Sequence, residues 1–238
     1  MKILIKKIMY LLGFELHRFS PENSSQARLM KMISIHSIDL VLDVGANVGM
    51  YSRTLRMCGY QGRLLAFEPL SKAREELLQL SSNDKMWDVA PQAAIGAENG
   101  EVEINVAGNS SSSSILNMMN SHKQAAPHSQ YVDVEKVPLR KLDTLTEGYR
   151  DKYSNIFLKI DTQGYEHFVL EGAKKTLKRV AGIQLELSLI PLYEGQILYD
   201  DLVDKMKILG FSMWDISTVL TEPKSGRLLQ VDAVFFRD

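Results

Sequence analysis

The stretch IDLVLDVGANVGMYSRTL, residues 38–55, decides the fold of this chain. Its residues 40–44 are almost all apolar, a run typical of a buried parallel strand. A glycine turn of residues 45–49 follows directly, and the segment after it has the pattern of a helix. A strand, a tight glycine turn and a helix start together predict a nucleotide-type pocket at the end of a parallel sheet.

The turn lacks the glycines that a phosphate-binding loop needs. A dinucleotide loop has the pattern Gly-x-Gly-x-x-Gly, which lets backbone amides close on a pyrophosphate. Counted from Gly45, the second and third glycine positions hold Asn47 and Met50. Asp43, just before the turn, would also repel a phosphate, because like charges at this distance raise the energy even when they are partly screened. We therefore expect a ligand without phosphate.

S-adenosylmethionine meets these requirements. It carries a sulfonium and an ammonium group, which a carboxylate at Asp43 favours, and glycines let its methionine part lie against the backbone. The stretch RLLAFEP, residues 63–69, predicts a second strand that leads to Glu68. A carboxylate there can accept hydrogen bonds from both ribose hydroxyls, as the corresponding acid does in dinucleotide folds. The cofactor that we predict is S-adenosylmethionine.

Strands and helices alternate along the rest of the chain, which predicts an α/β fold. The stretch WDVAPQAAIG, residues 87–96, predicts a third strand that ends near Gln92 to Ile95. Buried strands are also expected at NIFLKID and GIQLELS. The last two strands, FSMWDIS and LQVDAVFFR, can pair as a hairpin across a turn that contains Pro223 and Gly226.

Two spaced motifs resemble a known family. LDVGANVGMYS with FEP downstream is similar to class I methyltransferases. IFLKIDTQGYEHFVLEGA, residues 156–173, resembles the hallmark Lys-Ile-Asp-x-x-Gly-x-Glu of FkbM-type methyltransferases. The resemblance implies a Rossmann-like, seven-stranded, mostly parallel sheet with an antiparallel last strand and helices on both faces. It also implies methyl transfer, generally to oxygen.

The resemblance assigns residues to the cofactor and to the second motif. The residues that match the cofactor positions are Asp43, Gly45, Asn47, Gly49 and Glu68, with Ala94 in the region that flanks adenine. Lys159, Asp161, Gly164 and Glu166 match the second motif. This chain has Gln163 where many family members have Glu, so a role for an acid at that place does not carry over.

Asp161 is the candidate general base. It follows the strand NIFLKID, at the edge where open α/β sheets bind ligands, and could take the acceptor proton, orient the acceptor or hold the cofactor ammonium. Lys159 shares its face of the strand and could pair with Asp161 or with Glu186 on the neighbouring strand. The alternative for Asp161, Lys159 and Glu186 is a structural ion-pair network. No histidine pair has metal-ligand spacing, so we predict no metal site, and the alternative is a divalent ion that Asp161 and Glu186 share with a substrate.

Residues 109–130 form a serine-rich loop with little periodicity. Long loops inside a domain are often lids or binding loops, and the alternative is a flexible insertion. We expect this loop to cover the acceptor. The predicted substrate residues are Ser112, His122 and His128 from the loop, with Tyr165 at the pocket mouth.

The composition limits location and partners. The net charge of −1 gives no basic field for nucleic acid. One cysteine, Cys58, excludes an intramolecular disulfide and fits a reducing, cytoplasmic location. Residues 1–38 predict a helical extension before the methyltransferase domain of residues 39–238. Its first helix is expected to pack on that domain, and the alternative is a weak contact of a basic amphipathic helix with a membrane surface.

The favoured function is S-adenosylmethionine-dependent O-methylation of a sugar, a glycan or another small polyol-like metabolite. The alternative is an N-methyltransferase or a protein methyltransferase on the same fold. An NAD-dependent oxidoreductase or a noncatalytic binding module is less favoured. The sequence carries no signal for the identity of the acceptor or for the oligomeric state.

Overall fold

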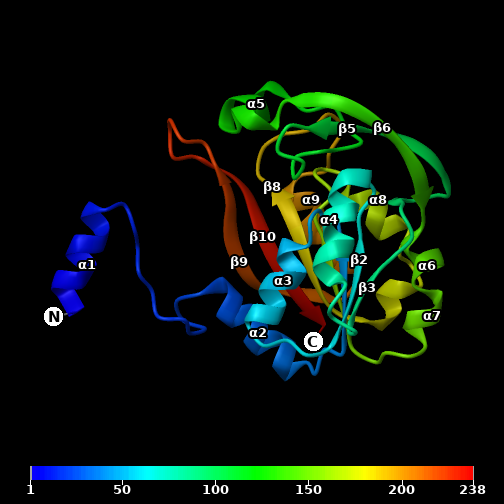
Figure 1. The fold of residues 1–238 in the computed structure, drawn as a ribbon, viewed down its shortest axis with the longest axis horizontal. Coiled ribbons are helices and arrows are strands. Elements are labelled where there is room, and N and C mark those ends of the chain that lie inside the picture. Colours follow the sequence, from blue (N-terminus) through cyan, green and yellow to red (C-terminus); the bar gives the residue numbers. More distant parts are fainter. Residues whose placement is uncertain (1, 238) are drawn as a thin grey trace.

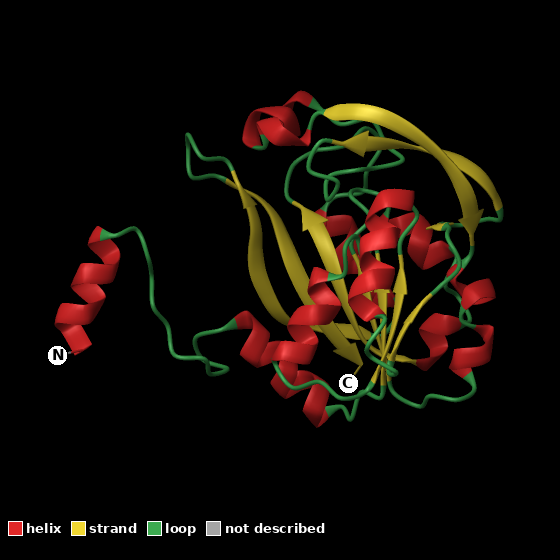
Figure 2. Cartoon of the chain, in the orientation of Figure 1, coloured by secondary structure: helices red, strands yellow, loops and turns green. Residues whose placement is uncertain are grey.

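A seven-stranded sheet with helices on both faces forms the body of the protein (Figures 1 and 2). The computed structural model describes residues 2–237. In spatial order the strands are β3 (Trp87–Val89), β2 (Arg63–Phe67), β1 (Leu40–Val44), β7 (Ile156–Ile160), β8 (Val180–Ser188), β10 (Leu228–Arg237) and β9 (Phe211–Thr221). The last strand in the chain, β10, runs antiparallel to both of its neighbours. The predicted Rossmann-like topology is confirmed.

Helices on each face bury the alternating side chains of the strands. On β1, Val41 packs in the core with α2 (Ser25–Ile35), α3 (Met50–Met57) and α4 (Ser71–Ser81). Its neighbour Leu42 faces the opposite core. The elements on that side are α6 (Leu142–Leu145), α7 (Glu147–Arg150), α8 (Glu166–Glu171), η2 (Thr176–Arg179) and α9 (Tyr199–Ile208). Period-two alternation therefore fixes which elements share a layer.

A second sheet of three strands lies beside the carboxyl ends of the parallel strands (Figure 1). Its order is β4 (Ala94–Ile95), β6 (Tyr131–Arg140) and β5 (Gly100–Ala107). The prediction of one strand from residue 87 to Ile95 is wrong. β3 ends at Val89 because Pro91 has no N–H to continue the ladder, and Ala94 then pairs with β6 instead.

The serine-rich segment has more local structure than its sequence pattern indicates. Ser114 bridges to Asn105 of β5, and α5 (Asn120–Ala125) and the short helix η1 (Pro127–Ser129) follow. Ser129 is fully buried. The segment therefore forms one unit with the second sheet.

Helix α1 (Lys2–Leu11) stands apart from the body (Figure 1). Ile8 is 48% exposed, Tyr10 57% and Leu11 80%, so the expected packing of this helix on the domain is not observed for the described residues. The second helix of the extension, α2, does pack on the domain, and Ser24 caps it by accepting the N–H of Ala27. None of the described helices has the length and hydropathy that a membrane crossing requires.

Candidate active site

The glycine turn after β1 brings its backbone against the end of β7. Gly45 has φ +75°, and a Cβ atom on it would lie 1.9 Å from the carbonyl oxygen of Asp161. Asn47 also has a positive φ, +48°. Gly49 has φ +87° and faces Leu77 of α4, where a Cβ would lie 2.7 Å from a methyl carbon. Glycine is therefore required at both positions, at the first for close backbone approach and at the second for helix packing.

The carboxylate of Glu68 is fixed by backbone donors from two elements. Its Oε2 accepts the N–H of Asn47 at 2.8 Å, and its Oε1 accepts the N–H of Leu70 at 2.8 Å. Burial raises the pKa of Glu68 to about 7, although both hydrogen bonds favour the ionised form. Each carboxylate oxygen has a second lone pair, so Glu68 can still accept two hydroxyl hydrogens.

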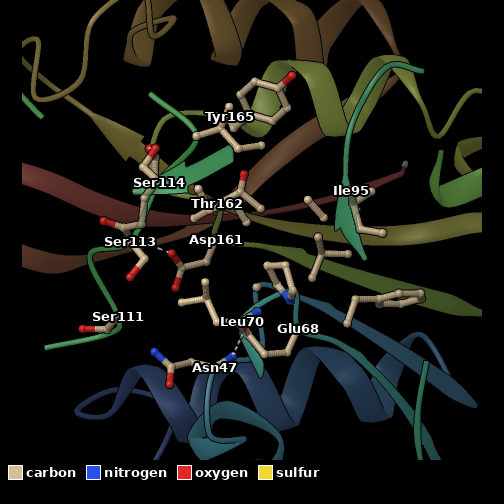
Figure 3. Close-up of a pocket in the computed structure, with 18 of the residues that line it drawn as sticks. Asn47, Glu68, Leu70, Ile95, Ser111, Ser113, Ser114, Asp161, Thr162 and Tyr165 are labelled. Atoms are coloured by element: carbon tan, nitrogen blue, oxygen red, sulfur yellow. Dashed lines mark hydrogen bonds between the residues drawn. The ribbon is translucent and has the colours of Figure 1, made fainter. Parts of the chain in front are cut away.

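A cavity of about 670 Å³, its open mouth included, lies between the glycine turn, β4 and the serine-rich segment. In Figure 3, Asn47 lies below the cavity, Ile95 on one side and the serines on the other. The lining residues from the predicted cofactor set are Gly45, Asn47, Glu68, Ala94 and Asp161. Lys, Arg and His are missing from the described residues of the lining.

Asp161 meets the cavity at the end of β7. Its carboxylate is 34% exposed, and its Oδ2 lies 3.4 Å from Nζ of Lys159. Lys159 also donates to the carbonyl oxygen of Gly45 at 3.1 Å. Burial alone would lower the pKa of Lys159, but the charges of Asp161 and Asp43 outweigh burial and the pKa is raised. Lys159 therefore stays cationic and holds Asp161 and the glycine turn together.

Asp43 does not line the cavity, contrary to the expectation that it contacts the cofactor. Its side chain is 0% exposed, and its Oδ1 lies 3.3 Å from Nζ of Lys159. Its Oδ2 accepts the hydroxyl of Ser52 at 2.8 Å. The carboxylate points toward α3 because side chains alternate along β1. Gly49 is likewise outside the lining. Both residues shape the turn from behind.

Glu186 is also separated from the cavity, so the structure does not support its assignment as a catalytic group. Gln163 stands between the two acids: its Nε2 donates to Oδ1 of Asp161 at 2.8 Å and to Oε2 of Glu186 at 2.7 Å. Burial and the nearby charge of Asp161 raise the pKa of Glu186 well above its usual range. Tyr193 completes the group by donating its hydroxyl to Oε1 of Gln163 at 2.7 Å.

Gln163 and Tyr193 are site residues that sequence reasoning missed. The departure from the family's Glu at Gln163 was the available signal, since an amide can donate to two carboxylates and an ionised acid cannot. Glu166 of the same motif orders the turn, because its Oε1 accepts the N–H of Thr162 at 2.9 Å and the N–H of Gly164 at 3.2 Å. No group of three or more His, Cys, Asp or Glu side chains between residues 2 and 237 is arranged for a metal ion.

The predicted substrate residues divide into one that lines the cavity and three that do not. Tyr165 lies on the wall. Ser112 is buried, and its hydroxyl accepts a hydrogen bond from Asn109 at 3.0 Å. His122 is 3% exposed, packs edge-on against Tyr193, and burial lowers its pKa to about 4. His128 is exposed on η1. Ser112, His122 and His128 do not line this cavity, because the segment turns their side chains away, and their contact with the acceptor stays a prediction.

Other serines of the segment close one side of the cavity. The amide of Asn47 donates to the hydroxyl of Ser110 at 3.1 Å. The hydroxyl of Ser114 donates to the carbonyl oxygen of Gln163 at 2.7 Å. Ser111 and Ser113 line the same side (Figure 3). The segment thus bridges from the glycine turn to the turn after β7.

The sequence model of a family described as the methyltransferase FkbM domain matches residues 43–213. This chain belongs to the FkbM methyltransferase family. The predicted resemblance is confirmed, and the match spans both the glycine turn and the Lys159–Asp161 motif.

Relatives of this FkbM methyltransferase include the 2-O-methyltransferase NoeI of Sinorhizobium fredii. It is 28% identical over 169 residues, which cover 66% of this chain and 67% of NoeI. Among solved structures, the methyltransferase FkbM from Methylobacillus flagellatus is similar, with 14% identity and a TM-score of 0.46. The similar region covers 84% of this chain and 43% of the Methylobacillus chain. Magnesium protoporphyrin IX methyltransferase from Synechocystis is also similar, with 11% identity and a TM-score of 0.48, over 90% of this chain and 78% of the Synechocystis chain.

Proposed function

We propose that the protein transfers the methyl group of S-adenosylmethionine to a hydroxyl oxygen of a sugar, a glycan or a small polyol-like metabolite. The observation that carries the proposal is the partly exposed carboxylate of Asp161 at the edge of the cavity. The other acid of the cavity, Glu68, is fixed by backbone donors. The name of NoeI, a 2-O-methyltransferase, supports oxygen as the accepting atom.

The cavity suits S-adenosylmethionine better than a dinucleotide. Glu68 offers acceptor positions to two ribose hydroxyls, and Ala94 and Ile95 give an apolar wall for a purine. A pyrophosphate would need cationic or clustered N–H donors, and no basic side chain is found among the described lining residues. When bound, S-adenosylmethionine supplies an electrophilic methyl group on a good leaving group.

The side chains around Asp161 then need to do two things. Gln163 and Lys159 hold the carboxylate from two sides, which fixes its direction toward the cavity. Asp161 would accept the hydroxyl proton while the bond from the acceptor oxygen to the methyl carbon replaces the methyl–sulfur bond, so that the acceptor oxygen does not become positively charged.

Titration calorimetry with S-adenosylmethionine and with NAD tests the cofactor. We expect binding of the first alone, and loss of that binding in Glu68→Ala. Incubation with carbon-13 methyl-labelled cofactor and a cell extract then identifies the product by its methyl resonance. A methoxy signal supports the proposal, whereas an N-methyl signal favours the alternative. Binding of NAD in place of S-adenosylmethionine would overturn the proposal.

A further inference from the structure

A second hollow lies on the α2 and α3 side of the sheet, and we name it the α2–α3 groove. It encloses about 1020 Å³, its mouth included, between α2, α3 and strands β8, β10 and β9. Its lining shares no described residue with that of the cofactor cavity. Nothing in the function described above uses this space, which is large enough for a sugar unit.

The groove and Asp161 lie on one continuous face of the sheet. Glu186 pairs with Asp232 across β8 and β10, and Asp232 pairs with Ser217 across β10 and β9. Ile160 pairs with Leu185, so Asp161 comes next to Glu186. Because side chains alternate along strands, these residues form one row that runs from Asp161 into the groove.

Tyr51 of α3 connects the groove wall to the same cluster. Its hydroxyl donates to Oε1 of Gln184 at 3.0 Å, and both residues line the groove. The ring centre of Tyr51 lies 5.4 Å from Nζ of Lys159. Lys159 in turn lies 3.4 Å from Asp161. The inner wall of the groove is therefore one side chain away from the candidate base.

The lining of the groove suits hydroxyl groups and offers no cationic side chain to an anion. It presents the carboxylates of Asp215 and Asp232, the amide of Gln184, and the hydroxyls of Ser217 and Thr54. Arg28 outside the lining neutralises Asp215 at 2.8 Å, and no basic residue occurs among the described lining residues. Apolar side chains of Leu29, Met30 and Met50 form the helical side. Carboxylates and amides beside an apolar wall favour neutral polyhydroxylated ligands.

The opposite approach to Asp161 is partly closed. The serine-rich segment bridges the cofactor cavity through Ser110 on Asn47 and through Ser114 on Gln163. On the other side, Asp161 is linked to the groove by the row of side chains that includes Glu186 and Asp232.

We propose that the α2–α3 groove binds the methyl acceptor, and that the acceptor carries a neutral polyhydroxylated unit such as a sugar without phosphate or carboxylate. The inference rests on the proposed function, because it assigns the acceptor side of the same reaction.

Cys58 gives a direct readout, since it lines the groove, is half-buried and is the single cysteine of the chain. The labelling rate of Cys58 by a maleimide is measured with the full chain and S-adenosylhomocysteine. The probes are methyl glycosides of neutral hexoses and deoxyhexoses, with glucose 6-phosphate for comparison. We expect a neutral glycoside to slow labelling about threefold at twice its Kd. Absence of protection by every neutral glycoside, or equal protection by the phosphate, overturns the proposal.

A matched pair of variants separates this inference from the proposed function. Ser217→Trp fills the groove, whereas Thr221→Trp places the same side chain farther along β9, outside the lining. Ser217→Trp should abolish protection of Cys58 and labelled-methyl incorporation into extract while cofactor affinity stays unchanged, and Thr221→Trp should change none of them. Normal labelled-methyl incorporation by Ser217→Trp overturns the proposed role of the α2–α3 groove and leaves the proposed function intact. Failure of the wild type to bind S-adenosylmethionine overturns the proposed function.

An independent observation concerns α1 and the segment after it. The exposed large apolar side chains there are Ile8, Tyr10, Leu11, Leu12, Phe14, Leu16 and Phe19. Residues 1–19 contain four Lys or Arg and one Glu, in a chain of net charge −1. We infer that this segment docks on an anionic membrane surface, because an apolar helix side with flanking lysines matches an acidic lipid interface.

Cosedimentation of the full chain with lipid vesicles tests the docking. Binding is expected to vesicles of phosphatidylcholine with phosphatidylglycerol, and to be far weaker with phosphatidylcholine alone. Joint substitution Lys6→Glu and Lys7→Glu should weaken binding at least about 30-fold. Lys174→Glu with Lys178→Glu, exposed on the body, is the control and should leave binding unchanged. Equal binding to both vesicle types overturns the inference. So does a chain that binds no vesicles but self-associates, if Leu11→Asp abolishes the self-association.

Discussion

The cofactor cavity and the α2–α3 groove both contain carboxylates, but the two regions hold them differently. In the cavity, Glu68 is fixed by the backbone N–H groups of Asn47 and Leu70. The geometry of the two turns sets the positions of these N–H groups. In the groove, Asp215 is held by the side chain of Arg28, 187 residues away. Backbone anchoring holds Glu68 in place whatever side chains positions 47 and 70 carry, whereas the position of Asp215 depends on a single side chain.

Asp161→Asn should have the largest effect, because Asp161 lies where the two regions meet. Loss of the general base is expected to lower turnover about 10²–10⁴-fold, while S-adenosylmethionine affinity and glycoside protection of Cys58 stay intact. Single-turnover assays and calorimetry measure the two quantities. Asp133→Asn, an exposed acid on β6, is the control. Unchanged turnover would show that Asp161 is structural.

Asp43→Ala should damage the scaffold behind the cavity. It removes one of the two carboxylates of buried Lys159, so we expect the free energy of unfolding to fall by about 3 kcal/mol. Ser52→Ala removes only the neutral partner of Asp43 and should cost about 1 kcal/mol. Urea denaturation compares the two variants. Equal losses would mean that the ion pair adds nothing beyond the hydroxyl contact.

Glu68 should make cofactor affinity depend on pH, with no matching effect on the groove. Its pKa is raised from 4.5 to about 7, and only the ionised carboxylate accepts two hydroxyl hydrogens. Affinity for S-adenosylmethionine should therefore rise as pH increases toward 7 and level off above it, by up to about tenfold per pH unit. For folding the sign is opposite: the contribution of Glu68 is present below pH 4.5 and is lost as pH rises through about 7.

Glu68→Gln isolates this titration from those of the other acids with a raised pKa, which are Glu166, Glu186 and Asp232. Calorimetry across the pH range should show weaker and pH-independent binding for the variant. A wild-type slope that persists in Glu68→Gln would assign the titration to another group.

Ser110→Ala should have the smallest effect. It removes one hydrogen bond between the serine-rich segment and Asn47, so S-adenosylmethionine affinity should fall by about 0.5–1.5 kcal/mol. Ser121→Ala, whose hydroxyl bonds to the carbonyl oxygen of Pro191 away from the cavity, is the matched control. Calorimetry of both variants tests whether the segment closes on the cofactor. Equal affinities of the two variants for S-adenosylmethionine would show that the serine-rich segment does not contribute to cofactor binding through Ser110.

The parts of the site that could be predicted are those set by short-range geometry. A strand followed by Gly45 and Asn47 places the turn at the sheet edge, and register pairs Val44 with Phe67, so Glu68 reaches the turn. Asp161 follows because β7 is the other neighbour of β1. The Rossmann-like main sheet could be predicted from the strand pattern and the family motifs, whereas the second sheet could not.

The remaining features depend on side-chain direction or on distant partners. Alternation along β1 turned Asp43 away from the cavity, and Gln163 came between Asp161 and Glu186. His122 lies in a segment without periodicity, so its contact with Tyr193 is set by tertiary packing. The groove is lined by α2, α3 and three strands that are far apart in sequence, so no local sequence pattern predicts it.

The short strand β4 has a consequence for how the second sheet opens. Ala94 and Ile95 face the cofactor cavity, while their backbone pairs with Leu139 and Arg140 of β6. Two residue pairs join this strand to the sheet, and Glu135 of β6 also accepts hydrogen bonds from Ser71 of α4, so β4 is one of the contacts that oppose local unfolding of β5 and β6. A molecule held between Glu68 and Ile95 should therefore slow hydrogen exchange of the backbone amides along β5 and β6, so exchange in the second sheet should report whether the cavity is occupied.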